Sequence, residues 1–329
     1  MINSRELFIG LDLGGTNIKA GVVSRDGKLL GRVHISTGRG PDVVIANLIK
    51  AAQSVVKRSK ISMNTIAAVG IASPGPLSTA AGIVYRSANL PGWSNVHLRD
   101  RIASALGKPA TLENDAKAAA YGEYWAGVGR NKSVRSMVML TLGTGVGGGI
   151  IVNGRLVHGA TESAAEIGHT IIVPGGDPCG CGQRGCLEVY TSAHRTGERA
   201  VARLKADDAP SSLRAVLKKH GTISARDVAE HAGAGDKLAR ELWDAMCRYL
   251  GIGCVNITHM IDPDMIVLAG GMAAAGNQLL RPVRRHFAKQ YWRMTPPQVT
   301  ITLPSLGGDA GIIGAAGVAI QQWQAVHHD

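Results

Sequence analysis

The layout that most constrains this chain is an apolar strand, a glycine turn and a second apolar strand, and it occurs twice. The first copy reads LFIGLDL at residues 7–13, then Gly14-Gly15-Thr16 and IKAGVVS; the second reads MVMLTLGTGVGGGIIV at residues 137–152. A helical pattern at 41–60 and a buried strand, AAVGIASPG, follow the first copy. The sequence therefore predicts two related α/β halves, each a mixed sheet with helices, that close around a cleft.

Both glycine turns suit the binding of phosphate, because backbone N–H groups can approach an anion where no Cβ obstructs them. Gly14, Gly15 and Thr16 form the first turn, and Thr144 and Gly145 belong to the second. Neither is a P-loop, since no Gly-Lys-Ser/Thr follows, and neither has the downstream acid of a dinucleotide-binding unit. One such turn is also consistent with a plain hairpin. Two of them, with Asp12 placed to hold Mg²⁺ through water, favour a nucleotide site.

The cysteines cluster in the string GHTIIVPGGDPCGCGQRGC, which also contains a histidine. Its candidate ligands are His169, Cys179, Cys181 and Cys186. Three thiolates and one imidazole are a standard tetrahedral zinc set, and four protein ligands leave no open position for catalysis. The alternatives are coincidental clustering of small residues and disulfide exchange, but the spacing resembles no redox CxxC pair. We expect a structural zinc here, and core thiols at Cys247 and Cys254.

Asp115 follows Asn114 where a predicted strand meets the helical stretch AKAAAYGEYWAG. An Asp at a helix start is commonly an N-cap. A carboxylate that accepts the proton of a sugar hydroxyl, however, contributes roughly 10²–10⁴-fold to the rate. The presence of polar residues suited to a polyol favours the catalytic interpretation over capping. They are Asn89, Asn114, Glu166, His169 and Glu188.

Eight motifs follow one another along the chain. They are DLGGTNIKAG at 12–21, SPGP at 73–76, SANLPGW at 87–93, ENDAKAAAYGEYWAG at 113–127, LTLGTGVGGGI at 140–150, EIGH at 166–169, CGCGQRGCLE at 179–188 and VLAGGM at 267–272. In this order they resemble the ROK family of the actin–hexokinase superfamily over essentially the whole chain. The combination is very specific, and SANLPGW with the long ENDA string is most similar to the bacterial ROK glucokinases.

The resemblance implies an α/β fold of the actin-like ATPase (ribonuclease H-like) class, with two domains around a cleft. We expect an N-terminal domain at 1–113, to which the C-terminal helix at 310–329 returns, and a C-terminal domain at 114–309 with the zinc loop. The implied activity is transfer of phosphate from Mg-ATP to the 6-hydroxyl of glucose by a homodimer, with Asp115 as general base.

The resemblance also implies roles at matching positions. The sugar hydroxyls are held by Gly75, Asn89, Asn114, Glu166, His169 and Glu188. The triphosphate lies on Gly14, Gly15 and Thr16 from one side and on Thr144 and Gly145 from the other, with Asp12 at Mg²⁺ and Gly270 and Gly271 near adenosine.

The sequence departs from the family at a few positions. Lys117 stands where a small or amide residue is usual, and Gly308 where an acid is common. Glu162, Ser163 and Ala165 replace residues that are commonly glycine. The change at Glu162 bears on hexose specificity more than on catalysis.

Two other functions stay open. A kinase of N-acetylglucosamine or N-acetylmannosamine shares almost every motif. A sugar-responsive ROK transcriptional regulator is suggested by the net charge of +12. The basic stretch at 281–293 has helical spacing, however, and is consistent with a solvated helix face. A DNA-binding domain needs about 60 residues ahead of the phosphate loop, where only 11 precede Asp12. We expect no specific nucleic-acid partner.

The first residues, MINSRELFIGLDLGGT, lack the pattern of a signal peptide. No apolar run approaches the roughly 18 residues of a membrane helix. We therefore expect a cytoplasmic protein without a membrane partner. Whether polyphosphate replaces ATP is not decided by these patterns.

Overall fold

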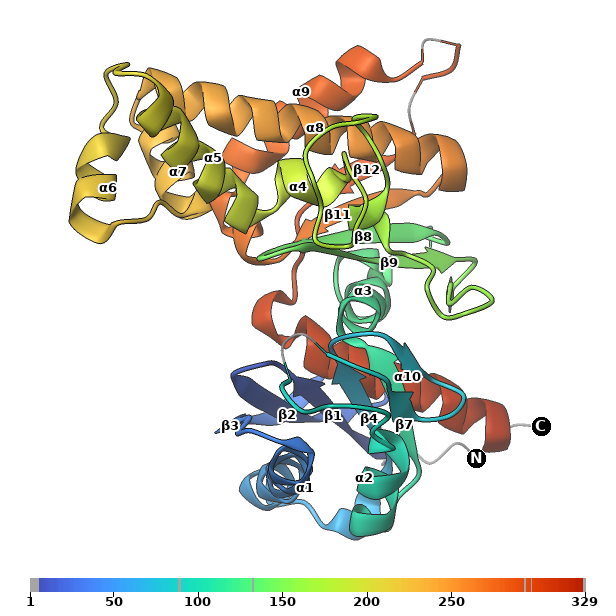
Figure 1. The fold of residues 1–329 in the computed structure, drawn as a ribbon. Helices are drawn as coiled ribbons and strands as arrows, with labels where there is room; N and C mark the ends of the chain where they lie inside the picture. The colour runs from blue at the N-terminus through green and yellow to red at the C-terminus, as the bar shows by residue number, and fades with distance from the viewer. Residues whose placement is uncertain (1–5, 88–89, 132, 293, 297, 328–329) are drawn as a thin grey trace. The chain divides into compact units, whose positions relative to one another are not determined.

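The structure is a computed structural model that describes residues 6–87, 90–131, 133–292, 294–296 and 298–327 (Figure 1). By contacts within the chain it divides into two units. The first unit is Met1–Val134, Gly149–Ala165 and Ser305–Asp329, and the second is Arg135–Gly148 and Glu166–Pro304. The domain limits expected from the sequence stay a prediction, because contacts within one chain do not define parts that fold independently.

One five-stranded sheet has the order β3-β2-β1-β4-β7. Its strands are β1 Leu7–Leu13, β2 Asn17–Ser24, β3 Leu29–Ser36, β4 Ile66–Ser73 and β7 Ala110–Asn114. The first three strands run antiparallel, and β4 and β7 continue the sheet parallel to β1. The strand expected at 7–13 and the hairpin that follows it are confirmed.

Helices cover both faces of this sheet (Figure 1). On one face lie α1 Pro41–Arg58 and α2 Leu98–Leu106; on the other lies α10 Ala310–His327, with α3 Asp115–Trp125 beside it. The α10 backbone approaches β1 so closely that a Cβ on Gly10 would lie 1.9 Å from the Ile312 carbonyl oxygen. Only glycine permits this approach.

A second five-stranded sheet has the order β10-β9-β8-β11-β12. Its strands are β8 Met137–Leu142, β9 Val146–Val152, β10 Arg155–Leu156, β11 Met265–Ala269 and β12 Thr300–Thr302. Here β11 lies parallel to both β8 and β12. The second copy of the strand, turn, strand layout thus forms β8, a glycine turn and β9. A separate small hairpin joins β5 Leu77–Ser78 to β6 Ile83–Val84.

The second unit also holds a group of helices. They are α4 Leu187–Thr191, α5 Ala193–Ala206, α6 Leu213–His220, α7 Ala225–Gly233, α8 Lys237–Ile261 and α9 Asn277–Gln290. Cys247 and Cys254 in α8 are fully buried, which confirms the prediction of core thiols. Arg293, the last residue of the basic stretch, lies outside the described residues. The part of the stretch up to Lys289 lies in α9, and most of its cations are exposed. His286 is not: it is buried, with Nε2 2.9 Å from Asp244 Oδ1.

Short 3₁₀ turns complete the chain. They are η1 Met63–Thr65, η2 Val128–Arg130, η3 Ile167–His169, η4 Gly271–Ala275 and η5 Gly307–Asp309. Among the described residues, no helix combines the length and the apolar character needed to cross a bilayer.

Candidate functional site

Asp115 is the first residue of α3, directly after β7. The N-cap is Asn114, whose Oδ1 accepts hydrogen bonds from the N–H groups of Ala116 and Lys117 at 3.0 and 3.2 Å. Asp115 Oδ1 accepts from the N–H of Ala116 at 2.8 Å. Capping therefore falls mainly on Asn114, and Asp115 stands at a rigid strand-to-helix junction at the positive end of the helix.

A hydrogen bond between the buried Glu113 and the half-buried His158 supports this junction. Glu113 is 2% exposed; its Oε1 accepts from the N–H of Asn114 at 2.8 Å, and its Oε2 lies 2.7 Å from His158 Nε2. The hydrogen bond to Glu113 raises the pKa of His158, and burial opposes the shift. The carboxylate just before Asn114 is thus fixed from both sides.

The first glycine turn lies between β1 and β2. Gly15 and Thr16 are exposed, and Thr37 holds the turn: its Oγ1 donates to the Gly14 carbonyl at 2.6 Å and its N–H donates to the Thr16 carbonyl at 2.9 Å. An exposed, well-supported turn of this kind presents backbone N–H groups to an anion.

Asp12 lies at the end of β1, 3.5 Å from Lys19 Nζ. Burial raises the pKa of Asp12, while Lys19 lowers it. A Cβ on Gly311 would lie 2.7 Å from the Asp12 carboxyl carbon, so glycine leaves room for the carboxylate. Lys19 Nζ also donates to the carbonyl of Gly308 at 3.0 Å, which joins this carboxylate to the turn before α10.

Gly75 lies in the loop after β4 with a φ of 94°, a conformation that L side chains rarely adopt. A Cβ there would also lie 2.3 Å from the Arg86 carbonyl oxygen. Asn89, which the sequence assigned to the sugar, lies outside the described residues.

The second glycine turn is held by Glu188, which lies in the first turn of α4, two residues after Cys186. Glu188 Oε2 accepts from the N–H of Val146 at 2.8 Å, and a Cβ on Gly145 would lie 2.4 Å from the same oxygen. The structure thus brings a residue predicted for the sugar against the turn predicted for phosphate. Thr144 belongs to this turn, whereas Glu166 is exposed as the N-cap of η3.

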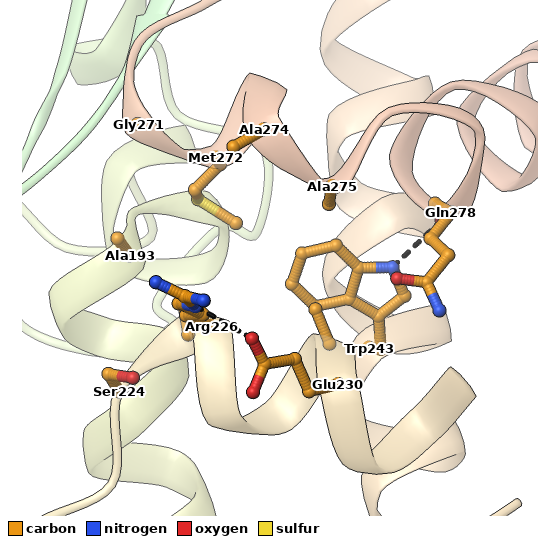
Figure 2. A pocket seen from close by; sticks show the side chains of 12 residues that line it. Ala193, Ser224, Arg226, Glu230, Trp243, Gly271, Met272, Ala274, Ala275 and Gln278 are labelled. Carbon is orange, nitrogen blue, oxygen red and sulfur yellow. Dashed lines mark hydrogen bonds and ion pairs between the residues drawn. The ribbon is translucent and has the colours of Figure 1, made fainter. Parts of the chain in front are cut away.

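A cavity of about 530 Å³ lies beside Gly271 in the second unit (Figure 2). The Trp243 indole forms one wall and donates from Nε1 to the Gln278 carbonyl at 2.9 Å. Arg226 forms another and pairs with Glu230 at 2.7 Å. A planar aromatic ring and a planar guanidinium are suited to a flat heterocycle.

Gly270 connects this cavity to β11. Its φ is 83°, and a Cβ would lie 2.5 Å from the Leu142 carbonyl oxygen at the end of β8. The sequence analysis singled out Gly270 and Gly271, of which Gly271 lines the cavity, but it did not single out Arg226 or Trp243. Neither residue has a motif, because they are brought to the cavity by α7 and α8.

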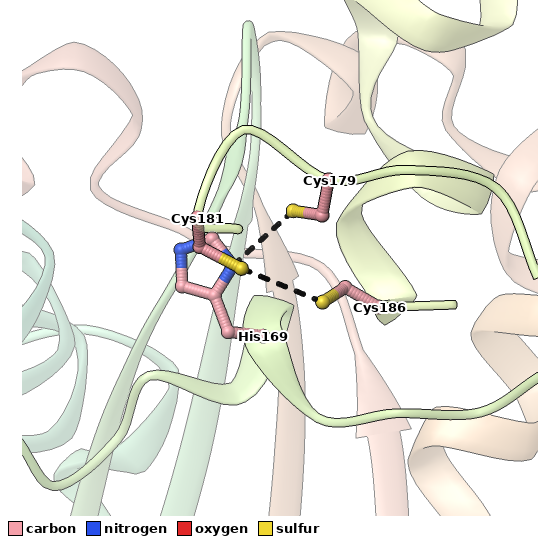
Figure 3. A group of neighbouring side chains, drawn as sticks. All are labelled: His169, Cys179, Cys181 and Cys186. Atoms are coloured by element: carbon pink, nitrogen blue, oxygen red, sulfur yellow. Dashed lines mark hydrogen bonds between the residues drawn. The ribbon is translucent and has the colours of Figure 1, made fainter. Parts of the chain in front are cut away.

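The predicted metal ligands come together. The ligand atoms of His169, Cys179, Cys181 and Cys186 all lie within 4.8 Å of one another (Figure 3). Cys179 Sγ is 3.7 Å from His169 Nδ1, and Cys181 Sγ is 3.7 Å from Cys186 Sγ. Thiolates at about 2.3 Å from a tetrahedral zinc lie roughly 3.8 Å apart. The four residues therefore fit zinc in both chemistry and spacing.

Two five-stranded mixed sheets, each with a glycine turn after its first strand, define an α/β protein of the actin-like ATPase fold. The chain belongs to the ROK family, whose model matches residues 8–322.

Similar proteins share nearly its whole length. A glucokinase of Halalkalibacterium halodurans is 34% identical over 319 residues, which is 96% of this chain and 95% of the relative. A glucokinase of Thermotoga maritima is 36% identical over 94% of this chain and 96% of the relative. The solved structure of a ROK family glucokinase from Streptomyces griseus in complex with glucose and AMPPNP has a TM-score of 0.79 and 31% identity. It covers 96% of this chain and 99% of that one.

Proposed function

We propose that this chain is an ATP-dependent glucose kinase, in which Asp115 removes the proton of the sugar 6-hydroxyl as that oxygen attacks the γ-phosphate. The relatives named glucokinase support the reaction, and the geometry at Asp115 supports the mechanism. The single observation that carries it is the division of labour between Asn114, which caps α3, and Asp115 beside it.

We assign the sugar hydroxyls to residues whose groups suit a polyol. Asn114, Glu166, His169 and Glu188 offer amide, carboxylate and imidazole groups, and the family resemblance adds Asn89 and the Gly75 backbone. Because the hydroxyl is a weak nucleophile, orientation and proton removal supply most of what the protein itself contributes.

Phosphoryl transfer needs the charge of the phosphates to be neutralised and their positions fixed. We assign the triphosphate to the turns at Gly14, Gly15 and Thr16 and at Thr144 and Gly145. Asp12 is the residue for Mg²⁺, which supplies further neutralisation when bound. The cavity beside Gly270 and Gly271 suits adenine, with Trp243 and Arg226 as its flat walls.

We further propose that the Cys/His cluster holds a structural zinc, since four protein ligands leave no open coordination position. Its place between Glu166 and Glu188 in the chain links the metal to two sugar-binding residues. A cytoplasmic homodimer without a specific nucleic-acid partner completes the proposal, on the strength of the family resemblance.

The test is phosphorylation of a sugar panel by the purified chain with Mg-ATP, read as ADP release. Glucose is expected to give the highest kcat/KM among glucose, mannose, N-acetylglucosamine and N-acetylmannosamine. The matched control, Asp115→Asn, keeps the shape of the side chain and should lower kcat by about 10² or more while sugar binding persists. A higher kcat/KM for an N-acetyl sugar overturns the glucose assignment, and near-normal turnover of the variant overturns the role of Asp115.

A further inference from the structure

The segment at residues 158–165, here called the 158–165 loop, is fastened to the elements on both sides of Asp115. His158 pairs with Glu113, two residues before Asp115, and Lys117 Nζ donates to the Glu162 carbonyl at 2.7 Å, two residues after it. The loop ends directly before Glu166, one of the residues proposed for the sugar. Its position is therefore coupled to the helix that presents the base.

The Glu162 side chain makes a further link. Its Oε1 accepts from both the N–H and the Oγ1 of Thr79, each at 2.8 Å. Thr79 follows β5 in the turn of the β5–β6 hairpin, four residues after Gly75, another residue proposed for the sugar. One carboxylate thus joins the 158–165 loop to the hairpin that follows Gly75.

Lys117 is a costly choice for this task. It is only 4% exposed and lies in the first turn of α3, where the helix dipole disfavours a cation. A buried ammonium is retained where it makes a specific hydrogen bond, and here that bond fixes a backbone carbonyl of the loop. We infer that this hydrogen bond fixes the position of the loop more than it stabilises the fold.

Glu162 is equally costly. Its φ is 63°, and that of Ala165 is 71°, in the left-handed region that favours glycine. The other carboxylate oxygen, Oε2, is buried without a hydrogen-bond partner in the described part of the chain. Such strain persists where surrounding contacts over-determine a residue, and it is typical of functional sites.

This inference rests on the proposed function. We propose that Lys117 and Glu162 are positioning residues, which hold the segments 74–80 and 158–165 in their sugar-binding arrangement before the sugar binds. We call the three residues Thr79, Lys117 and Glu162 the clamp. A preformed site avoids the cost of ordering loops on binding. The clamp therefore lowers KM for the sugar without touching the reacting atoms.

Three variants separate the clamp from general stability. Thr79→Val removes the hydroxyl at constant shape, and Thr79→Ser restores it as the conservative control. Glu162→Gly removes the carboxylate and also relieves the positive φ. If Glu162 had only a structural role, its replacement by glycine would leave KM unchanged.

Steady-state kinetics with glucose and ATP, and hydrogen exchange of residues 74–80 and 158–165 in sugar-free protein, provide the readouts. Thr79→Val and Glu162→Gly should raise KM for glucose about tenfold or more, as expected for a lost hydrogen bond to a charged group. Exchange should quicken in both loops. The kcat and the KM for ATP should stay within about twofold, and Thr79→Ser should match the wild type.

Wild-type KM for glucose in both folded variants overturns the clamp, as does unchanged exchange in the two loops. A wild-type chain that phosphorylates no hexose instead overturns the proposed function, and the sugar-binding role of the clamp with it. Kinetics of the wild type and exchange in the variants thus tell the two failures apart.

Discussion

At the scale of single residues, the junction between β7 and α3 shows how three neighbours share the work. Glu113 is buried and holds the backbone, Asn114 caps the helix, and Asp115 stands at the positive end of the helix dipole. Asn114 supplies the N-cap, and Asp115 adds one bond from the N–H of Ala116. The proposed role of Asp115 as base needs the rigidity that these neighbours supply.

The pair between His158 and Glu113 predicts a pH dependence of stability. The hydrogen bond to Glu113 raises the pKa of His158, so the folded state binds the proton more tightly than the unfolded state, whose value is about 6.5. The stabilising contribution is fully present below that value and is lost as pH rises through the raised pKa of the folded state. Lys117 opposes the shift and Glu162 supports it.

Thermal melts of the wild type and of His158→Gln at several pH values check this. Gln can still donate to Glu113 but does not titrate. The melting temperature of the wild type should therefore exceed that of the variant by more at pH 6 than at pH 8.5. An equal difference at both pH values would show that the charge of His158 has no part in holding the junction.

At the scale of elements, the loop at 169–186 predicts a coupling between metal, stability and sugar binding. It contains the four residues proposed as metal ligands, and Glu188, next to its end, accepts from the N–H of Val146 in the second glycine turn. Removing zinc by chelation, or Cys181→Ser, should lower the melting temperature and weaken sugar binding together. The melting temperature should fall by roughly 2–4 °C for each kcal/mol by which the free energy of unfolding decreases.

Elemental analysis, thermal melts and sugar titration measure the three quantities. Cys254→Ala is the matched control: it removes a fully buried thiol outside the cluster, so stability should fall while zinc and sugar affinity are kept. Fully active protein without zinc would contradict the coupling.

The elements also show what the sequence could predict. β1, the turn after it, β8, β9 and α1 were predicted because apolar periodicity and glycine punctuation are local signals. The clustering of His169, Cys179, Cys181 and Cys186 was predicted because they lie within eighteen positions of one another.

The rest depended on contacts between distant segments. Lys117 and Glu162 appeared in the sequence only as departures from a family pattern, and nothing local indicates that Lys117 Nζ reaches a carbonyl 45 residues away. Trp243 likewise has the pattern of a core residue in a long helix. Its place on a cavity wall follows from how α7, α8 and η4 pack. Contacts between side chains of distant elements leave no periodic pattern in the sequence, so they could not be predicted from it.

At the scale of the whole molecule, the net charge of +12 raises the question of nucleic acid. Several arginines are already paired with acids on their own unit, as Arg285 is with Asp244, Arg99 with Asp100 and Arg203 with Asp207. Arg284 donates to the Ile301 carbonyl instead. Cations engaged within the chain release fewer counterions on binding DNA, so a weak, salt-sensitive association is expected.

Fluorescence anisotropy with two unrelated duplexes of equal length, titrated from 50 to 200 mM salt, measures this association. Binding should be detectable only at the low-salt end, should not distinguish the duplexes, and should not respond to glucose. Counterion release predicts that log K falls linearly with log salt, with a slope of about −0.9 for each phosphate contacted, so the slope gives the number of phosphates contacted. Binding at 150 mM salt that prefers one duplex, and that changes with glucose, would instead place this chain among sugar-responsive DNA-binding proteins, because two ligands that alter each other's affinity must be thermodynamically coupled through the same fold.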